Sequence, residues 1–141
     1  MANIVILAVL LLTLLPAAAP AIAQDSGFDE TSINSIWHKA KLRGVAFRAV
    51  GQEPGWLLEI TTGTEILLEL DYGQIKKSYP YVEPVVYQEE RLTRYIVDEG
   101  ELTIEIRGQH CQDVMSGEQF EVSVTIIMPD RQLAGCGRAL Y

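Results

Sequence analysis

The side chains best suited to chemistry are gathered in residues 110–120. An imidazole, two carboxylates and a hydroxyl lie there within nine residues, as in a hydrolase with Ser116 as nucleophile and His110 and Asp113 beside it. Ser116 has no Gly-x-Ser-x-Gly elbow, however, and a nucleophilic serine needs a base within about 3 Å and an oxyanion site. His110 and Asp113 alone do not fill a tetrahedral metal shell. We therefore predict no catalytic residue, cofactor or metal, and expect Asp113 and Ser116 to shape the loop through local hydrogen bonds.

A second notable segment is a Pro-Gly turn followed by tryptophan, at residues 51–56. Pro54 holds φ at about −65° and Gly55 permits a positive φ, so the pair predicts a type II turn. Trp56 then begins a strand. It is either a core residue beside a tight turn or an anchor that joins Glu53 in a recognition surface.

The two cysteines, Cys111 and Cys136, are separated by 24 residues. Two thiols in a small domain usually pair in an oxidising compartment. Closing a loop of this size contributes about 3 kcal/mol in the chain-entropy model. A catalytic thiol is the alternative, and so is a metal pair, although His38 and His110 are the only histidines available as further ligands. We predict a disulfide.

The elements that position residues 51–56 and 110–120 are predicted to be one short helix and a series of short strands. Apolar residues at helical spacing from Ile33 to Ala40 predict a short helix, capped by Ser32 and ending at Gly44. Beyond it the apolar period changes to two, and turn residues separate the predicted strands at 45–50, 56–61, 65–72, 94–97, 102–107, 120–127 and 132–135. Residues 79–84 contain two prolines, which predict a loop or an edge segment.

Six to eight short strands after one helix predict an all-β fold, a small antiparallel β-barrel or sandwich with a packed core. The disulfide would join the segment before the Phe120 strand to the strand after it. We expect a signal peptide at 1–23, an N-terminal segment with the short helix at 24–44, and a β-barrel-like domain at 45–141.

The first 23 residues are typical of a secretory signal. Residues 4–15 are apolar except Thr13, and the small residues that follow close with Ala-Ile-Ala. Cleavage between Ala23 and Gln24 would release a periplasmic or secreted protein. An uncleaved anchor is the alternative, because the apolar stretch and its Ala/Pro tail together reach the roughly 20 residues of a membrane span.

All 30 formal charges follow residue 23, and the 19 acidic and 11 basic side chains give a net charge of −8. Nucleic acids and anionic membrane surfaces are bound by clustered Lys and Arg side chains, so neither is an expected partner of this acidic chain. Between Glu83 and Glu121 lie ten carboxylates and three arginines, which we interpret as the wet face of the sheet. We expect a protein or envelope ligand and no membrane insertion after cleavage.

Three motifs follow one another along the chain: Gly-x-Glu-Pro-x-Trp at 51–56, Cys-x-Asp-x-Met-Ser-Gly at 111–117 and Gly-Cys-Gly at 135–137. In these motifs the chain resembles a family of uncharacterised bacterial envelope proteins, over most of residues 37–140. The resemblance implies a periplasmic domain that contains the Cys111–Cys136 disulfide. It implies little about activity.

The five residues Ser-Gly-Glu-Gln-Phe at 116–120 are also similar to a loop of bacterial lysozyme inhibitors. Those proteins are small exported β-barrels that insert a Ser-Gly-x-x-Tyr loop into the lysozyme cleft. Phe120 stands where they have tyrosine, which removes one expected hydrogen bond. By analogy, Ser116 would approach the catalytic carboxylates of a basic lysozyme, while Asp113 and Cys111 hold the loop rigid, and the negative net charge would steer the encounter.

The sequence thus predicts an exported, non-enzymatic envelope binding module. The lysozyme inhibitor and the Ser116 hydrolase are its alternatives, and the ligand, the oligomeric state and the proximity of the two segments stay open. The predicted recognition surface combines Glu53, Trp56, Asp113, Ser116, Gly117 and Phe120.

Overall fold

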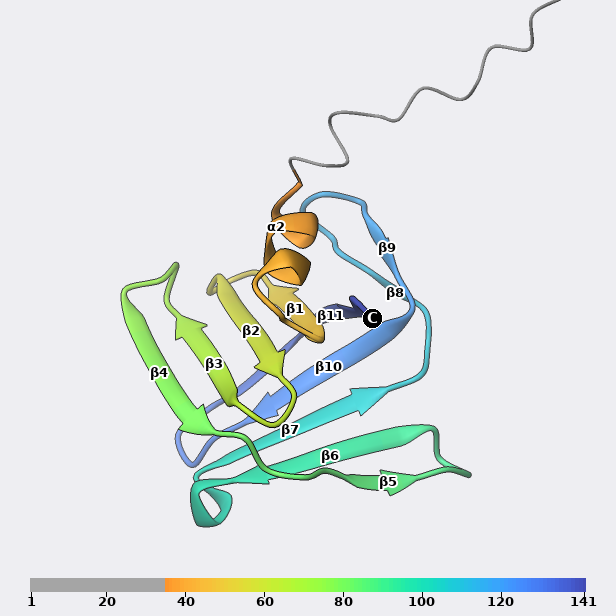
Figure 1. The fold of residues 1–141 in the computed structure, drawn as a ribbon. Helices are drawn as coiled ribbons and strands as arrows, with labels where there is room; N and C mark the ends of the chain where they lie inside the picture. Colours follow the sequence, from red (N-terminus) through yellow and green to blue (C-terminus); the bar gives the residue numbers. More distant parts are fainter. Residues whose placement is uncertain (1–34) are drawn as a thin grey trace, which may run out of the picture.

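The computed structural model describes residues 35–141, which form a strongly curled antiparallel half-barrel with one helix on its outer surface (Figure 1). The predicted signal peptide, Ser32 and Ile33 lie outside the described residues. The elements are α2 (Ile36–Leu42), β1 (Phe47–Gly51), β2 (Trp56–Thr61), β3 (Glu65–Leu70), β4 (Ile75–Pro80), β5 (Val85–Tyr87), β6 (Leu92–Val97), η1 (Asp98–Gly100), β7 (Leu102–Arg107), β8 (Cys111–Gln112), β9 (Gln119–Phe120), β10 (Val122–Ile127) and β11 (Gln132–Ala139).

The main sheet has nine strands in the order β4-β3-β2-β1-β11-β10-β7-β6-β5, and β8 and β9 form a separate two-stranded ribbon. The predicted all-β class and antiparallel pairing are confirmed, and residues 35–141 contain one α-helix. The strands are more numerous than the six to eight expected, because β4, β5 and the ribbon are additional elements. Pro80 ends β4, which is an edge strand as the prolines indicated, so its missing N–H faces no further strand.

Alternate side chains of the strands point into the concave face and form the core. Its fully buried large members are Leu58, Ile60, Ile66, Leu68, Leu70, Val97, Leu102, Ile104, Val124 and Ile126. The alternation is clean in β3, where Ile66, Leu68 and Leu70 are buried and the residues between them are partly exposed. The core therefore follows the period of two in the sequence.

Trp56 fits this core because two glycines face its indole. Gly51 pairs with Trp56 across β1 and β2, and a Cβ on Gly51 would lie 2.0 Å from Trp56 Nε1. A Cβ on Gly135 would lie 2.6 Å from Trp56 Cζ2 and 2.2 Å from the carbonyl oxygen of Val50. The first and third sequence motifs are therefore in contact, and only glycine leaves room for the ring.

Replacing Gly135 with alanine tests this packing. The new methyl group meets backbone as well as the buried indole, so we expect Gly135→Ala to lower the free energy of unfolding by about 3 kcal/mol, measured by urea denaturation. Gly55→Ala is the matched control, because its methyl meets only the exposed ring of Tyr72, which can turn away. Equal losses in the two variants would contradict a special requirement at Gly135.

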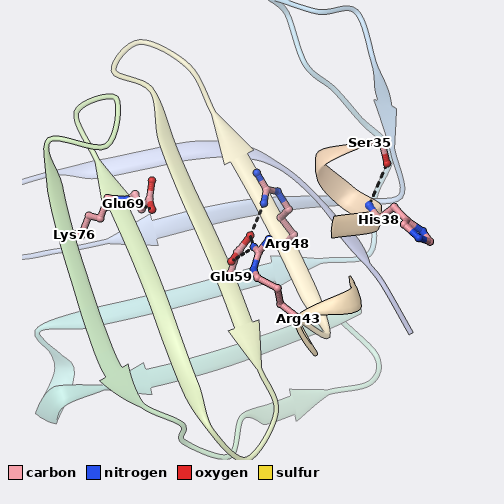
Figure 2. Close-up of polar contacts among 7 residues, drawn as sticks. All are labelled: Ser35, His38, Arg43, Arg48, Glu59, Glu69 and Lys76. Carbon is pink, nitrogen blue, oxygen red and sulfur yellow. Dashed lines mark hydrogen bonds and ion pairs between the residues drawn. The ribbon is translucent and has the colours of Figure 1, made fainter. Parts of the chain in front are cut away.

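Helix α2 begins one turn later than predicted. Ser35 is its N-cap and accepts a hydrogen bond from the backbone N–H of His38 at 3.1 Å (Figure 2). The helix ends at Leu42, and Gly44 follows with a φ of +90°, so the predicted glycine stop is confirmed.

The chain just after the helix is tied to the sheet by a buried carboxylate. Glu59 on β2 accepts from Arg43, at 2.8 and 2.9 Å, and from Arg48 on β1 (Figure 2). The side chains of Glu59 and Arg48 are almost wholly buried, whereas Arg43 is half exposed. A charge at this depth needs a partner, so the three side chains depend on one another.

Neutralising this carboxylate is expected to be costly. Glu59→Gln keeps the shape but leaves Arg48 buried without a counter-charge, so we expect a loss of about 3 kcal/mol in thermal or urea unfolding. Glu69→Gln on β3 is the control, since Glu69 pairs with the exposed Lys76 at 2.8 Å and should cost at most about 1 kcal/mol (Figure 2). A Glu59→Gln variant as stable as Glu69→Gln would show that the buried cluster contributes nothing.

Candidate functional site

A tight loop of residues 113–118 connects β8 to β9 and closes on its own backbone. The N–H of Asp113 donates to the carbonyl of Glu118 at 3.0 Å, and the N–H of Gly117 donates to the carbonyl of Asp113 at 2.7 Å. Gly117 has a φ of +74°, a conformation that glycine adopts readily. The tip of the loop is therefore held without help from the rest of the molecule.

Asp113 and Ser116 add side-chain bonds that fasten the loop further. The Ser116 hydroxyl donates to Asp113 Oδ2 at 2.6 Å and accepts from the N–H of Glu118 at 3.2 Å. The N–H of Ser116 also donates to Asp113 Oδ2, at 3.2 Å. Local hydrogen bonds thus shape the loop, as its sequence predicted.

These bonds also change the acidity of Asp113. The bond from the Ser116 hydroxyl is the main cause that lowers the pKa of the Asp113 carboxyl below its ordinary value. Burial opposes this effect, and the N–H groups of Ser116 and Met115 add to the lowering. The carboxylate is therefore ionised at neutral pH, and its bonds to the loop persist until the pH falls through the lowered pKa.

Two apolar side chains project from the tip of this fastened loop. Val114 is 89% exposed and Met115 is 65% exposed, and Ser116 and Gly117 beside them are exposed as well. An apolar pair in a loop is unusual, because solvent-facing turns favour polar residues. Neither residue was among those predicted for the recognition surface, although Met115 belongs to the second motif and both lie between Asp113 and Ser116.

The base of the loop is anchored by the predicted disulfide. Cys111 on β8 is bonded to Cys136 on β11, which confirms the pairing. The ribbon also carries Phe120, whose ring lies 5.4 Å from that of Trp37 on α2. Arg138 lies over both rings, 4.9 Å from the centre of Phe120 and 5.2 Å from that of Trp37. The ribbon is thereby packed against the helix and β11.

Two of the predicted surface residues are buried. Trp56 is 4% exposed and Phe120 is 3% exposed, so both side chains serve packing and neither forms an outer contact surface in this structure. The core interpretation of Trp56 is the one that holds. Glu53 is exposed. A surface formed by the two segments would therefore consist of their exposed residues.

The turn before Trp56 differs from the predicted type II turn. The Glu53–Pro54 peptide bond is cis, and the positive φ of this turn, +56°, falls on Glu53. Gly55 is not in the left-handed region. Glycine at position 55 instead leaves room for the ring of Tyr72, because a Cβ there would lie 2.6 Å from that ring.

A groove of about 390 Å³ brings the three sequence motifs together on the outer side of β10 and β11. Gln52 comes from the first motif, Asp113 and Val114 from the second, and Gly135 from the third. The other lining residues are Gly51, Gln109, Cys111, Gln112, Ser123, Val124, Thr125, Ala134 and Cys136. The two segments chosen from the sequence, 51–56 and 113–120, therefore do meet. At the meeting point the first segment contributes Gln52 to the groove, and neither Glu53 nor Trp56 lines it.

The groove is rich in hydrogen-bonding groups that carry no charge. The amides of Gln52, Gln109 and Gln112 line it, each with donors and an acceptor. Ser123 and Thr125 add hydroxyls, and Asp113 is the single charged residue in the lining. The arrangement suits a polar, uncharged stretch of a partner beside an apolar tip.

The hydrogen bonds of the Ser116 side chain are made within the 113–118 loop. Its hydroxyl donates directly to the Asp113 carboxylate, and within residues 35–141 His110 makes no side-chain hydrogen bond to either of them. No group of three or more His, Cys, Asp or Glu side chains in the described part of the chain is placed to hold a metal ion.

Removing the Ser116 hydroxyl should release the Asp113 carboxyl. We expect Ser116→Ala to raise the pKa of Asp113 toward its ordinary value, because the bond that most lowers it is lost. A carbon-13 NMR titration of the carboxyl group measures this change, with Ser123→Ala as the control. An unchanged pKa in Ser116→Ala would contradict the hydrogen-bond arrangement of the loop.

A scan against protein-family models, a search of curated proteins and a search of solved structures gave no match. Across residues 35–141, no helix is both long and apolar enough to cross a membrane.

Proposed function

We propose that this chain is an exported, non-enzymatic module that binds a protein partner through the 113–118 loop and the adjoining groove. The observation that carries the proposal is the pair Val114 and Met115, exposed on a loop whose backbone is already held by hydrogen bonds. Apolar anchors on a rigid loop lose little conformational entropy on binding, so more of their burial energy appears as affinity.

The neighbouring groove suits the region of the partner around such an anchor. Its glutamine amides and its Ser123 and Thr125 hydroxyls supply hydrogen bonds around an apolar centre. Binding interfaces commonly combine a desolvated apolar centre with a polar rim of this kind. The disulfide keeps the loop and the groove in a fixed relation, because Cys111 and Cys136 both line the groove.

The charge of the chain favours a cationic partner. The net charge is −8, and opposite charges raise the rate of encounter at low salt. Export and signal cleavage are part of the proposal. They are supported by the apolar segment and Ala-Ile-Ala sequence of the first 23 residues, and agree with the presence of a disulfide.

A basic lysozyme is the specific partner favoured by the loop. The exposed Ser-Gly segment at 116–117 resembles the start of the Ser-Gly-x-x-Tyr loop that the lysozyme inhibitors insert into the enzyme cleft. Here the Ser116 hydroxyl is already engaged with Asp113 and the N–H of Glu118, so insertion would rely on Val114 and Met115 for contact. The hydrolase alternative has no comparable support.

Binding to a basic lysozyme tests both the loop and the partner. We expect saturable binding of the oxidised chain from residue 24, together with inhibition of lysozyme turnover, and both should weaken at higher salt. A variant with both Val114→Ser and Met115→Ser should lose at least about tenfold in affinity because its apolar contacts are removed.

Ile96→Ser is the control, since Ile96 is also an exposed apolar residue, at 54%, and lies on β6, away from the loop. A basic ribonuclease should bind far more weakly than the lysozyme. Absence of lysozyme binding at micromolar protein would rule out this partner. Equal losses in the loop and Ile96 variants would rule out the loop as the contact.

A further inference from the structure

A second hollow lies on the concave side of the half-barrel. It has a volume of about 490 Å³, within the range of small-molecule sites, and is named the mouth pocket. It is lined by Phe47, Thr93, Tyr95, Ile106, Glu121, Val122 and Ala139, from β1, β6, β7, the junction before β10, β10 and β11. None of these residues lines the groove beside the 113–118 loop.

Small residues on β11 create this space. The sheet register places Phe47 opposite Ala139 and Val122 opposite Gly137, so large side chains on the neighbouring strands face small ones. A Cβ on Gly137 would lie 2.5 Å from the Phe47 ring. The small residues of β11 therefore allow Phe47 to lie close to the strand, and the space beside Ala139 is left open as part of the mouth pocket.

The lining is apolar but is not closed from solvent. Phe47, Tyr95, Ile106 and Val122 pack against the core on one side and are only partly buried. A smaller hollow of about 320 Å³ shares Thr93, Ile106 and Val122 and continues toward β5. An apolar ligand that covers this surface is stabilised in proportion to the apolar area that it removes from water.

The polar groups of the lining restrict the charge of an occupant. Glu121 is its one charged residue, and its carboxylate lies 3.9 Å from Arg138 Nε. An anion would meet Glu121 and no cation in the lining, while a cation would lose its hydration against apolar side chains. An uncharged molecule avoids both costs.

Two hydroxyls can orient such a molecule. Thr93 and Tyr95 both line the mouth pocket, and within residues 35–141 neither side chain makes a hydrogen bond to another side chain. Burial raises the pKa of Tyr95 to about 12, so its phenol stays protonated and can donate at neutral pH.

We propose that the mouth pocket binds an uncharged, largely apolar small molecule, whose polar group bonds to the hydroxyls of Thr93 and Tyr95. The site is separate from the protein-binding loop, so the chain has two binding faces. Shape and apolar contact with Phe47, Ile106 and Val122 supply most of the affinity, and the hydroxyls select a ligand that carries a hydroxyl or amide.

The neutral fluorophore N-phenyl-1-naphthylamine is a direct probe of this site. We expect saturable binding at one molecule per chain, and displacement of the probe by decanol. Decanoate and decylammonium should compete at least about tenfold more weakly, because each carries a charge into an apolar lining. No fluorescence change on titration, or equal competition by the charged compounds, would overturn the proposal.

Two tryptophan substitutions on the same strand locate the site. Ala139 and Ala134 are both exposed on β11, but Ala139 lines the mouth pocket and Ala134 lines the groove beside the loop. Ala139→Trp should abolish probe binding and leave lysozyme binding intact, whereas Ala134→Trp should do the reverse. Equal effects of the two variants on probe binding would overturn the assignment of the ligand to the mouth pocket. Because probe binding and lysozyme binding are measured separately, each of the two proposed functions can fail without the other.

A conservative variant covers the case in which Ala139→Trp does not fold. Tyr95→Phe keeps the ring and removes only the hydroxyl. It should weaken decanol binding about fivefold, the effect of one hydrogen bond, while the unfolding midpoint stays the same. Decanol binding that is unchanged in Tyr95→Phe and Thr93→Val alike would refute the hydroxyl contacts and with them the proposed ligand class.

Discussion

The close contact between the Trp56 indole and two glycines determines how this fold is assembled. Gly51 and Gly135 belong to β1 and β11, and each lies so near the ring that a methyl group would overlap it. The indole is buried although its N–H finds no acceptor among the described residues, a cost that good packing must offset. Because β1 and β11 are central in the sheet, this contact holds the two halves of the half-barrel together.

The outer face of the same strands carries a second, smaller packed region that places the loop. Arg48 and Arg138 are directly opposite each other on β1 and β11, an arrangement that is unfavourable for like charges. Trp37 lies within about 5.4 Å of both guanidinium groups, and Glu59 neutralises Arg48. Phe120 joins this region from the ribbon, so the base of the 113–118 loop is fixed to the helix and the sheet together.

The three sequence motifs therefore combine residues that build the fold with residues that are exposed. Gly51, Trp56 and Gly135 are packing residues, and Cys111 and Cys136 form the crosslink. What faces solvent is the remainder: Gln52 at one side of the groove, and the loop tip with Val114 and Met115 at the other. These exposed residues lie within the first and second motifs, next to the residues that build the fold.

The amino-acid sequence by itself determined the elements. Its period of two, its turn residues and its paired cysteines were enough to predict an all-β antiparallel fold, one helix, an edge segment at the prolines and the disulfide, because each depends on local spacing or on the chemistry of single residues. The hydrogen bonds between Asp113 and Ser116 were predictable for the same reason, since only two residues lie between them. Contacts between residues that are far apart in the chain were decided only by the tertiary structure. Burial of Trp56 and Phe120, the meeting of Gln52 with Val114, and the hollow beside Ala139 follow from the register of strands and from side-chain volumes across them, which no local pattern records.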